Sequence, residues 1–126
     1  MPSSDKALDH YLSLNPTVFD VLDRFEFRQQ ERWIDAYCSK YVYILELWLS
    51  SGSSDDPRRL HLLFDDVQQL RFEARVGPLT LPLVIRSLQH DQWEYLRYRV
   101  IDREEEILAF YSRGFAAELI EGSTQG

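Results

Sequence analysis

Cysteine is nearly absent from this sequence, which has 126 residues and one cysteine, Cys38. A single thiol excludes an intrachain disulfide, and the usual cysteine and histidine spacings of a zinc site are missing as well. A chain of this length can nevertheless bury a core without cross-links. We therefore expect a single domain over residues 1–126 that folds in a reducing compartment, without metal or other cofactor.

Long apolar runs and glycine-rich loops are missing too. No stretch approaches the roughly 20 apolar residues of a membrane span, and Asp5, Lys6 and Asp9 place charge where a secretory signal needs an apolar core. These features predict a cytoplasmic protein that does not bind a membrane. The five glycines are scattered, and none opens a helix after a strand as a phosphate-binding loop requires.

Positive charge is in the minority. The 14 lysines and arginines stand against 21 aspartates and glutamates, which gives a net charge of -7. Such a chain repels a phosphate backbone, so nucleic acid is not an expected ligand. The balance favours a neutral or basic protein partner, and it also serves solubility alone.

Hydrophobic spacing predicts a helix followed by strands. Residues 4–14 have helical spacing, and Asn15 and Pro16 end that segment. From residue 19 to 116 apolar and polar residues alternate, as is typical of strands. About six or seven strands are expected, and the tail 121–126 should fray. The predicted fold class is α+β, mainly β, with the N-terminal helix packed on a curved antiparallel sheet or sandwich.

Four strand segments carry more specific signals. The strand at 40–50 is apolar on both faces and should be central, with one face formed by Tyr41, Tyr43, Leu45, Leu47 and Leu49. In residues 58–74 the alternation breaks at Asp65, Asp66 and Val67 and then resumes, which predicts a corner between two strands. Pro82 lacks a backbone donor and therefore predicts either an edge strand or a solvent-facing register at that point. Residues 93–115 predict a final hairpin.

Reactive groups are few and isolated. His10, His61, His90 and Cys38 fall on different predicted elements, and no neighbour of Cys38 would lower its pKa. Carboxylates cluster at the predicted turns, where they serve either turn geometry or a basic partner, and no calcium-loop spacing is present. The clustered carboxylates are Asp55, Asp56, Asp65, Asp66, Glu104, Glu105 and Glu106.

Arginine outnumbers lysine twelve to two, and several arginines fall on predicted strands. Arg71 and Arg75 share one strand face, as do Arg97 and Arg99. If these strands are neighbours, the arginines form a cationic stripe for a carboxylate or phosphate. Cross-strand pairing with acidic residues is the alternative. Most of the three Trp, seven Tyr and seven Phe are expected in the core, and any exposed beside arginine would mark a protein-binding surface.

The runs "LHLLFDDVQQLRF", "LPLVIRSL" and "EILAFYSRGF" resemble the small bacterial immunity proteins of polymorphic toxin systems, particularly the immunity protein 50 group. The likeness spans about residues 17–115 and includes the corner from Phe64 to Val67. The resemblance implies a stoichiometric cytoplasmic inhibitor that binds a cognate, often basic, toxin domain and catalyses no reaction.

Three functional hypotheses follow. The leading one is a binding protein whose acidic residues Asp55, Asp56, Asp65, Asp66, Glu104, Glu105 and Glu106, together with exposed aromatics, engage a basic protein. The main alternative is a small-molecule or anion-binding β-domain, with a pocket between sheet and helix lined by aromatics and by one or more of Arg71, Arg97 and Arg99. An enzyme would require His61 or His90 beside Cys38 or a carboxylate in a cleft. Pairing of two copies about a twofold axis stays open.

Overall fold

The computed structural model describes residues 6–53, 55–73, 79–88, 97–102 and 107–121. Helix α1 covers Lys6–Ser13, and one 3-10 turn, η1, covers Pro16–Val18. Asn15 joins them in the left-handed conformation, with φ at 54°. The predicted helix is confirmed from Lys6 onward. In this described part of the chain, no helix is long and apolar enough to cross a membrane.

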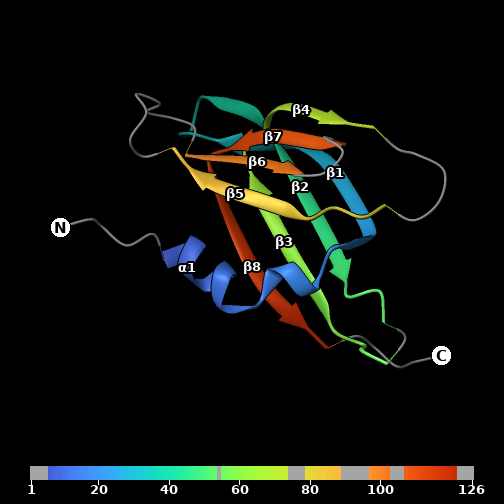
Figure 1. The fold of residues 1–126 in the computed structure, drawn as a ribbon. Coiled ribbons are helices and arrows are strands. Elements are labelled where there is room, and N and C mark those ends of the chain that lie inside the picture. Colours follow the sequence, from blue (N-terminus) through green and yellow to red (C-terminus); the bar gives the residue numbers. More distant parts are fainter. Residues whose placement is uncertain (1–5, 54, 74–78, 89–96, 103–106, 122–126) are drawn as a thin grey trace.

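Eight strands form two antiparallel sheets, stacked as two layers whose strands run in different directions (Figure 1). This confirms the predicted fold class. Sheet A has the order β1-β2-β3-β8, and sheet B has the order β4-β7-β6-β5. The strands are β1 (Val21–Trp33), β2 (Ser39–Ser50), β3 (Arg59–Asp65), β4 (Gln68–Phe72), β5 (Leu83–Ser87), β6 (Tyr98–Asp102), β7 (Leu108–Ser112) and β8 (Gly114–Ile120).

The core lies between the two sheets and centres on Phe64. This side chain is fully buried, and its ring lies 4.7 Å from that of Phe110 in sheet B and 5.8 Å from that of Phe115 on β8. The Phe64 and Phe110 rings meet edge to face, at 78°, which is a favoured aromatic geometry. Around them, both sheets contribute alternate apolar residues, as the two-residue period predicts: Leu45, Leu47, Leu49, Leu60, Leu62, Tyr98, Val100 and Leu108.

The break at Asp65 to Val67 is a corner, as predicted, and it carries the chain from one sheet to the other. Strand β3 ends in sheet A at Asp65, and β4 begins in sheet B at Gln68. Asp66 has a φ of 54°, a left-handed conformation that aspartate tolerates better than most residues. The Val67 N–H donates to the Tyr43 carbonyl at 2.9 Å, which fixes the corner on β2.

A second crossing lies beside the first and was not predicted. The segment 106–115 was expected to be one strand, but β7 ends at Ser112 in sheet B and β8 begins at Gly114 in sheet A. The Arg113 N–H donates to the Asp65 carbonyl at 3.0 Å, so the two crossings are joined. The core-facing parity changes at this crossing, because β7 turns Leu108 and Phe110 inward whereas β8 turns Phe115 and Ala117 inward. The sequence shows this change as a shift of one residue, which the expectation of a single strand overlooked.

The segment around Pro82 and the N-terminal helix lie at the periphery of the two sheets. Strand β5 is an edge strand and begins directly after Pro82, which confirms the prediction drawn from that proline. Just before it, Leu22 N–H donates to the Leu79 carbonyl at 2.9 Å, so this segment joins the start of β1. Helix α1 contacts β8 and lies across the end of the molecule where β8 and β5 separate (Figure 1). Tail residues 122–126 lie outside the described residues.

Truncation of Phe64 tests the central role of this ring. Phe64→Ala should lower the free energy of unfolding by about 3–5 kcal/mol, since it removes buried area and leaves a cavity. Phe27→Ala is a matched control, because Phe27 is 41% exposed, and its loss should stay below about 1.5 kcal/mol. Urea unfolding followed by circular dichroism measures both. Equal losses for the two variants would contradict this description of the core.

Candidate partner-binding surface

Exposed apolar side chains gather on one hairpin. The structure has eight large apolar side chains that are exposed among the described residues, and six of them lie between residues 27 and 43. Tyr37 is 96% exposed and Trp33 is 62% exposed. Contiguous exposed apolar side chains of this kind mark interaction sites more often than isolated ones do. We call these six residues the aromatic end of the β1–β2 hairpin: Phe27, Trp33, Ile34, Tyr37, Tyr41 and Tyr43.

The aromatic end exists because β1 and β2 are longer than the sheet that covers them. A strand of 12 residues spans about 40 Å, whereas sheet B, with four strands of five residues, extends roughly 17–19 Å in either direction. Leu45, Leu47 and Leu49 are buried beneath sheet B. Tyr41 and Tyr43 have the same parity, as predicted, but lie beyond the cover, and β3 pairs with β2 only from Leu45 to Leu49.

Local contacts hold this end in one shape. The rings of Phe27 and Tyr43 stack at 5.3 Å and 13°. At the turn, Ile34 N–H donates to the Cys38 carbonyl at 2.8 Å, and the Tyr37 N–H donates to Asp35 Oδ1 at 2.8 Å. Rigid, exposed aromatics lose little conformational entropy on binding, which is the property of good interface anchors.

The opposite face of the hairpin is braced by ion pairs. Arg32 holds Asp65 through two hydrogen bonds, at 2.9 and 3.1 Å, and this contact raises the pKa of the Arg32 guanidinium. Arg28 pairs with Glu46, one strand away. A bidentate arginine and carboxylate pair has a fixed geometry. These ion pairs support the hairpin from the face opposite to the exposed aromatics.

The predicted acidic residues do not form one patch. Asp55 and Asp56 precede β3, while Asp65 and Asp66 end it, so the pairs are separated by about 20 Å of strand. Arg58 bonds Asp56 and lowers the pKa of that carboxyl to about 2. Asp66 is 2% exposed and lies 3.9 Å from Lys40, so its carboxylate is not accessible to a partner in this structure. Glu104, Glu105 and Glu106 lie outside the described residues.

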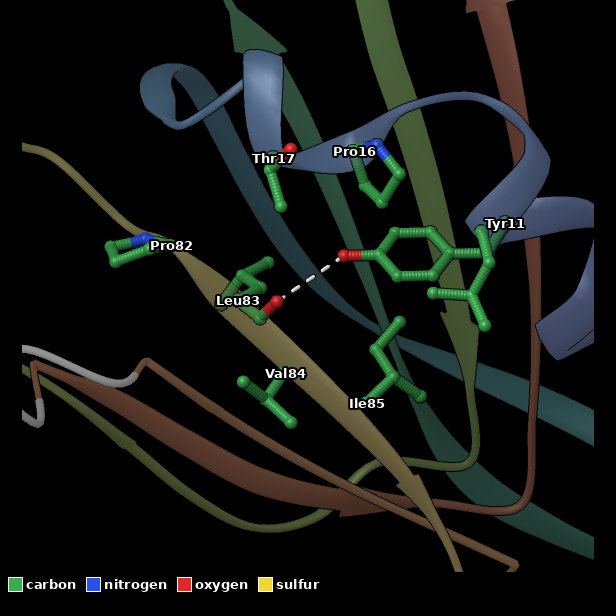
Figure 2. Close-up of a pocket in the computed structure, with 8 residues that line it drawn as sticks. Tyr11, Pro16, Thr17, Pro82, Leu83, Val84 and Ile85 are labelled. Atoms are coloured by element: carbon green, nitrogen blue, oxygen red, sulfur yellow. Dashed lines mark hydrogen bonds between the residues drawn. The ribbon is translucent and has the colours of Figure 1, made fainter.

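A pocket does lie between the helix and a sheet, as the alternative hypothesis requires (Figure 2). Its volume is about 240 Å³, and its walls come from α1, η1 and β5. Tyr11 points across it and donates from its hydroxyl to the Leu83 carbonyl at 3.4 Å. Arg71, Arg97 and Arg99 do not line it. The residues that do are mostly apolar: Tyr11, Leu12, Pro16, Thr17, Pro82, Leu83, Val84 and Ile85.

One histidine meets the geometric requirement set for an enzyme. His61 Nε2 lies 2.8 Å from Glu46 Oε1 beside a shallow pocket, and His61 Nδ1 lies 3.5 Å from Glu118 Oε1. Burial alone would raise the pKa of Glu46, but hydrogen bonds with Arg28 and His61 outweigh it and lower that pKa. Both ring nitrogens face carboxylates, and the other pocket-lining residues are alanine and leucine. Cys38 lies on a different element, at the hairpin turn, and His90 lies outside the described residues.

The sequence predicts that some aromatic side chains are exposed, but it does not indicate which ones. The feature of the sequence that could have identified them is the polar run from Arg28 to Arg32. Gln29 and Glu31 in this run lie opposite Tyr43 and Tyr41 on β2, and polar residues at these positions indicate that this face of the hairpin is not covered.

Comparison with known proteins adds one finding. The family model described as immunity protein PIM8 matches residues 4–118. No curated protein and no solved structure matches the chain. The resemblance to bacterial immunity proteins noted from the sequence is therefore confirmed, and the match gives the family as PIM8.

The Tyr11 phenol predicts a loss of stability in alkali. Burial raises its pKa to about 12, above the value of about 10 in an unfolded chain. The contribution of the neutral phenol to the free energy of unfolding is therefore fully present below pH 10. It falls by about 2 kcal/mol as the pH rises toward 12. Tyr11→Phe should be less sensitive between pH 10 and 12 while remaining near wild-type stability at pH 7.

Urea unfolding at pH 7, 10 and 11.5 measures this difference. Tyr37→Phe is the control, because the Tyr37 side chain is exposed and its loss should leave the alkaline response unchanged. An identical alkaline decline in wild type and Tyr11→Phe would show that the phenol does not contribute.

Proposed function

The chain belongs to the immunity protein PIM8 family, and from this membership we propose that it neutralises a cognate toxin domain by binding it directly, with no catalysis of its own. The observation that carries the proposal is the aromatic end of the β1–β2 hairpin. An immunity protein needs a preformed surface that a toxin can cover. This hairpin presents such a surface on a rigid two-stranded support.

The chemistry of the aromatic end suits a protein partner. Trp and Tyr dominate the binding energy of protein interfaces, because each buries a large area and loses few rotamers. Trp33, Tyr37 and Tyr41 are the most exposed aromatics described. Around them Gln29, Gln30, Glu31 and Asp35 are exposed and polar, which gives the apolar centre and polar rim found in stable interfaces.

The charge of the chain would govern the rate at which it associates with the partner. The net charge of -7 accelerates encounter with a basic toxin domain and makes the association rate sensitive to salt. Of the acidic residues proposed to face the partner, Asp55 is the clearest candidate, because it is exposed and no ion pair among the described residues involves it. Action on a toxin inside the cell would place the protein in the cytoplasm.

The pocket beside Tyr11 supports a small-molecule function less well. Apart from the Tyr11 hydroxyl and Thr17, its lining offers no side chain that could orient a polar ligand. Arg71, Arg97 and Arg99, which the alternative required, are not among its lining residues. Protein binding at the hairpin therefore stands as the single proposed function.

Truncation of the aromatic end tests the proposal. Trp33→Ala and Tyr41→Ala should each weaken binding to the toxin domain encoded beside this chain about 10- to 100-fold, because each removes an exposed anchor. The free energy of unfolding should change by less than about 1 kcal/mol. Isothermal titration calorimetry and protection of cells that express the toxin are the measurements.

Leu12→Ala is the matched control, since Leu12 is an exposed apolar residue on α1, away from the hairpin. Its affinity should equal that of wild type. Wild-type affinity in both hairpin variants would place the interface elsewhere. Self-association of the wild-type chain that Trp33→Ala abolishes would instead assign the aromatic end to pairing of two copies.

Charge reversal at Asp55 tests the electrostatic part. Asp55→Lys should slow association about 2- to 5-fold at low salt and leave the dissociation rate unchanged, since a peripheral charge acts mainly on encounter. Asp9→Lys makes the same change in net charge on the exposed side of α1 and should slow association less. Stopped-flow measurements over a range of salt concentrations compare them. Equal rates for Asp55→Lys and wild type would reject a role for this carboxylate.

A further inference from the structure

Four arginines share the outer face of sheet B. Tyr98 and Val100 of β6 point into the core, so Arg97 and Arg99, with the opposite parity, face outward. Arg86 on β5 pairs directly with Arg99, and Arg71 on β4 pairs with Ala109, which has the outward parity of β7. The strands of Arg71 and Arg99 are not neighbours, because β7 lies between β4 and β6, so the expected stripe does not form as foreseen. The direct neighbour of Arg99 is instead Arg86 on β5. We call Arg71, Arg86, Arg97 and Arg99 the basic face.

The basic face differs from sheet A in how its charges are compensated. Arg28, Arg32 and Arg59 of sheet A each hold a carboxylate, from Glu46, Asp65 and Asp23 respectively. No ion pair joins the arginines of the basic face to any carboxylate in the described part of the chain. In a protein with 21 acidic residues against 14 basic ones, such an uncompensated cluster is unexpected for arginines that serve only solubility.

The strand register makes the cluster unfavourable in the free protein. Arg86 and Arg99 are direct cross-strand partners, and like charges in that position destabilise a sheet. Arg99 turns away from Arg86. Its guanidinium lies 5.1 Å from the centre of the Tyr111 ring and donates to the Tyr111 hydroxyl. Both arginines thus have donors that an anion could bind, and an anion between them would remove the repulsion.

We infer that the basic face is a docking surface for an acidic segment of a protein partner. Arginine binds carboxylates in a bidentate geometry, and the adjacent Arg86, Arg99 and Arg97 could hold successive side chains of an extended acidic segment, with Arg71 farther along the same face. Half-buried Val84 and Ile101 form the next outward-facing pair beside Arg86 and Arg99, and they offer apolar contact to a polypeptide. A phosphate backbone would gain nothing from these apolar side chains, so a polypeptide fits this face better than nucleic acid. This inference does not depend on the toxin-binding proposal.

A short acidic peptide tests the inference directly. The probe is fluorescein-labelled octaglutamate, with octaglutamine as the uncharged peptide, and binding is followed by fluorescence anisotropy at low salt. The full chain should bind octaglutamate and not octaglutamine. The double variant Arg86→Gln, Arg99→Gln should bind it at least 10-fold more weakly. Its melting temperature should equal or exceed that of wild type, because the substitution removes a like-charge pair.

Arg58→Gln is the matched control, since Arg58 is an exposed arginine that already bonds Asp56, and it should retain wild-type affinity for the probe. Trp33→Ala should retain it as well, which separates this face from the aromatic end. The inference is overturned if octaglutamate does not bind, or if Arg58→Gln weakens binding as much as the double variant. Tighter binding of an eight-residue oligothymidylate at the same arginines would also overturn it, in favour of a nucleic-acid surface.

Discussion

The burial of Phe64 between two sheets of unequal strand length is the constraint on which the rest of this structure depends. Its ring meets Phe110 of sheet B and Phe115 of the neighbouring strand β8, and both partners come from a C-terminal segment far from Phe64 in the sequence. Contacts so distant in sequence carry a loop-closure cost, which only extensive apolar burial offsets. The short strands of sheet B cover the core and do not extend beyond it.

The exposed aromatic surface results from the point at which sheet B stops covering sheet A. The long β1–β2 hairpin continues past sheet B, and the residues that would have been core in a larger sandwich become an exposed aromatic surface. The ion pairs of Arg28 and Arg32 stabilise the back of the same hairpin. An immunity protein gains from this arrangement, because a rigid projecting hairpin can enter a concave partner without rearranging the core that supports it.

The two crossings between sheets connect the core to the surface. Asp65 takes part in both crossings, because it ends β3 at the first and its carbonyl accepts from Arg113 N–H at the second. Its carboxylate also accepts two hydrogen bonds from Arg32. A residue that looks from sequence like a generic acidic turn residue is thus engaged in holding the sandwich together. The contrast with Asp55, which is exposed, shows why a cluster of carboxylates in a sequence does not define a patch on a surface.

The sequence by itself determined the local features: the N-terminal helix, the strand periodicity, the edge strand after Pro82 and the corner at Asp66. Each of these depends on backbone chemistry or on the parity of a few neighbouring residues. Only the tertiary structure decided that Tyr41 and Tyr43 lie uncovered while Leu45 is buried on the same strand face, that β7 and β8 belong to different sheets, and that Arg86 lies opposite Arg99. Alternation states which residues share a face of one strand, but coverage and register depend on segments far away along the chain, and no local pattern encodes them.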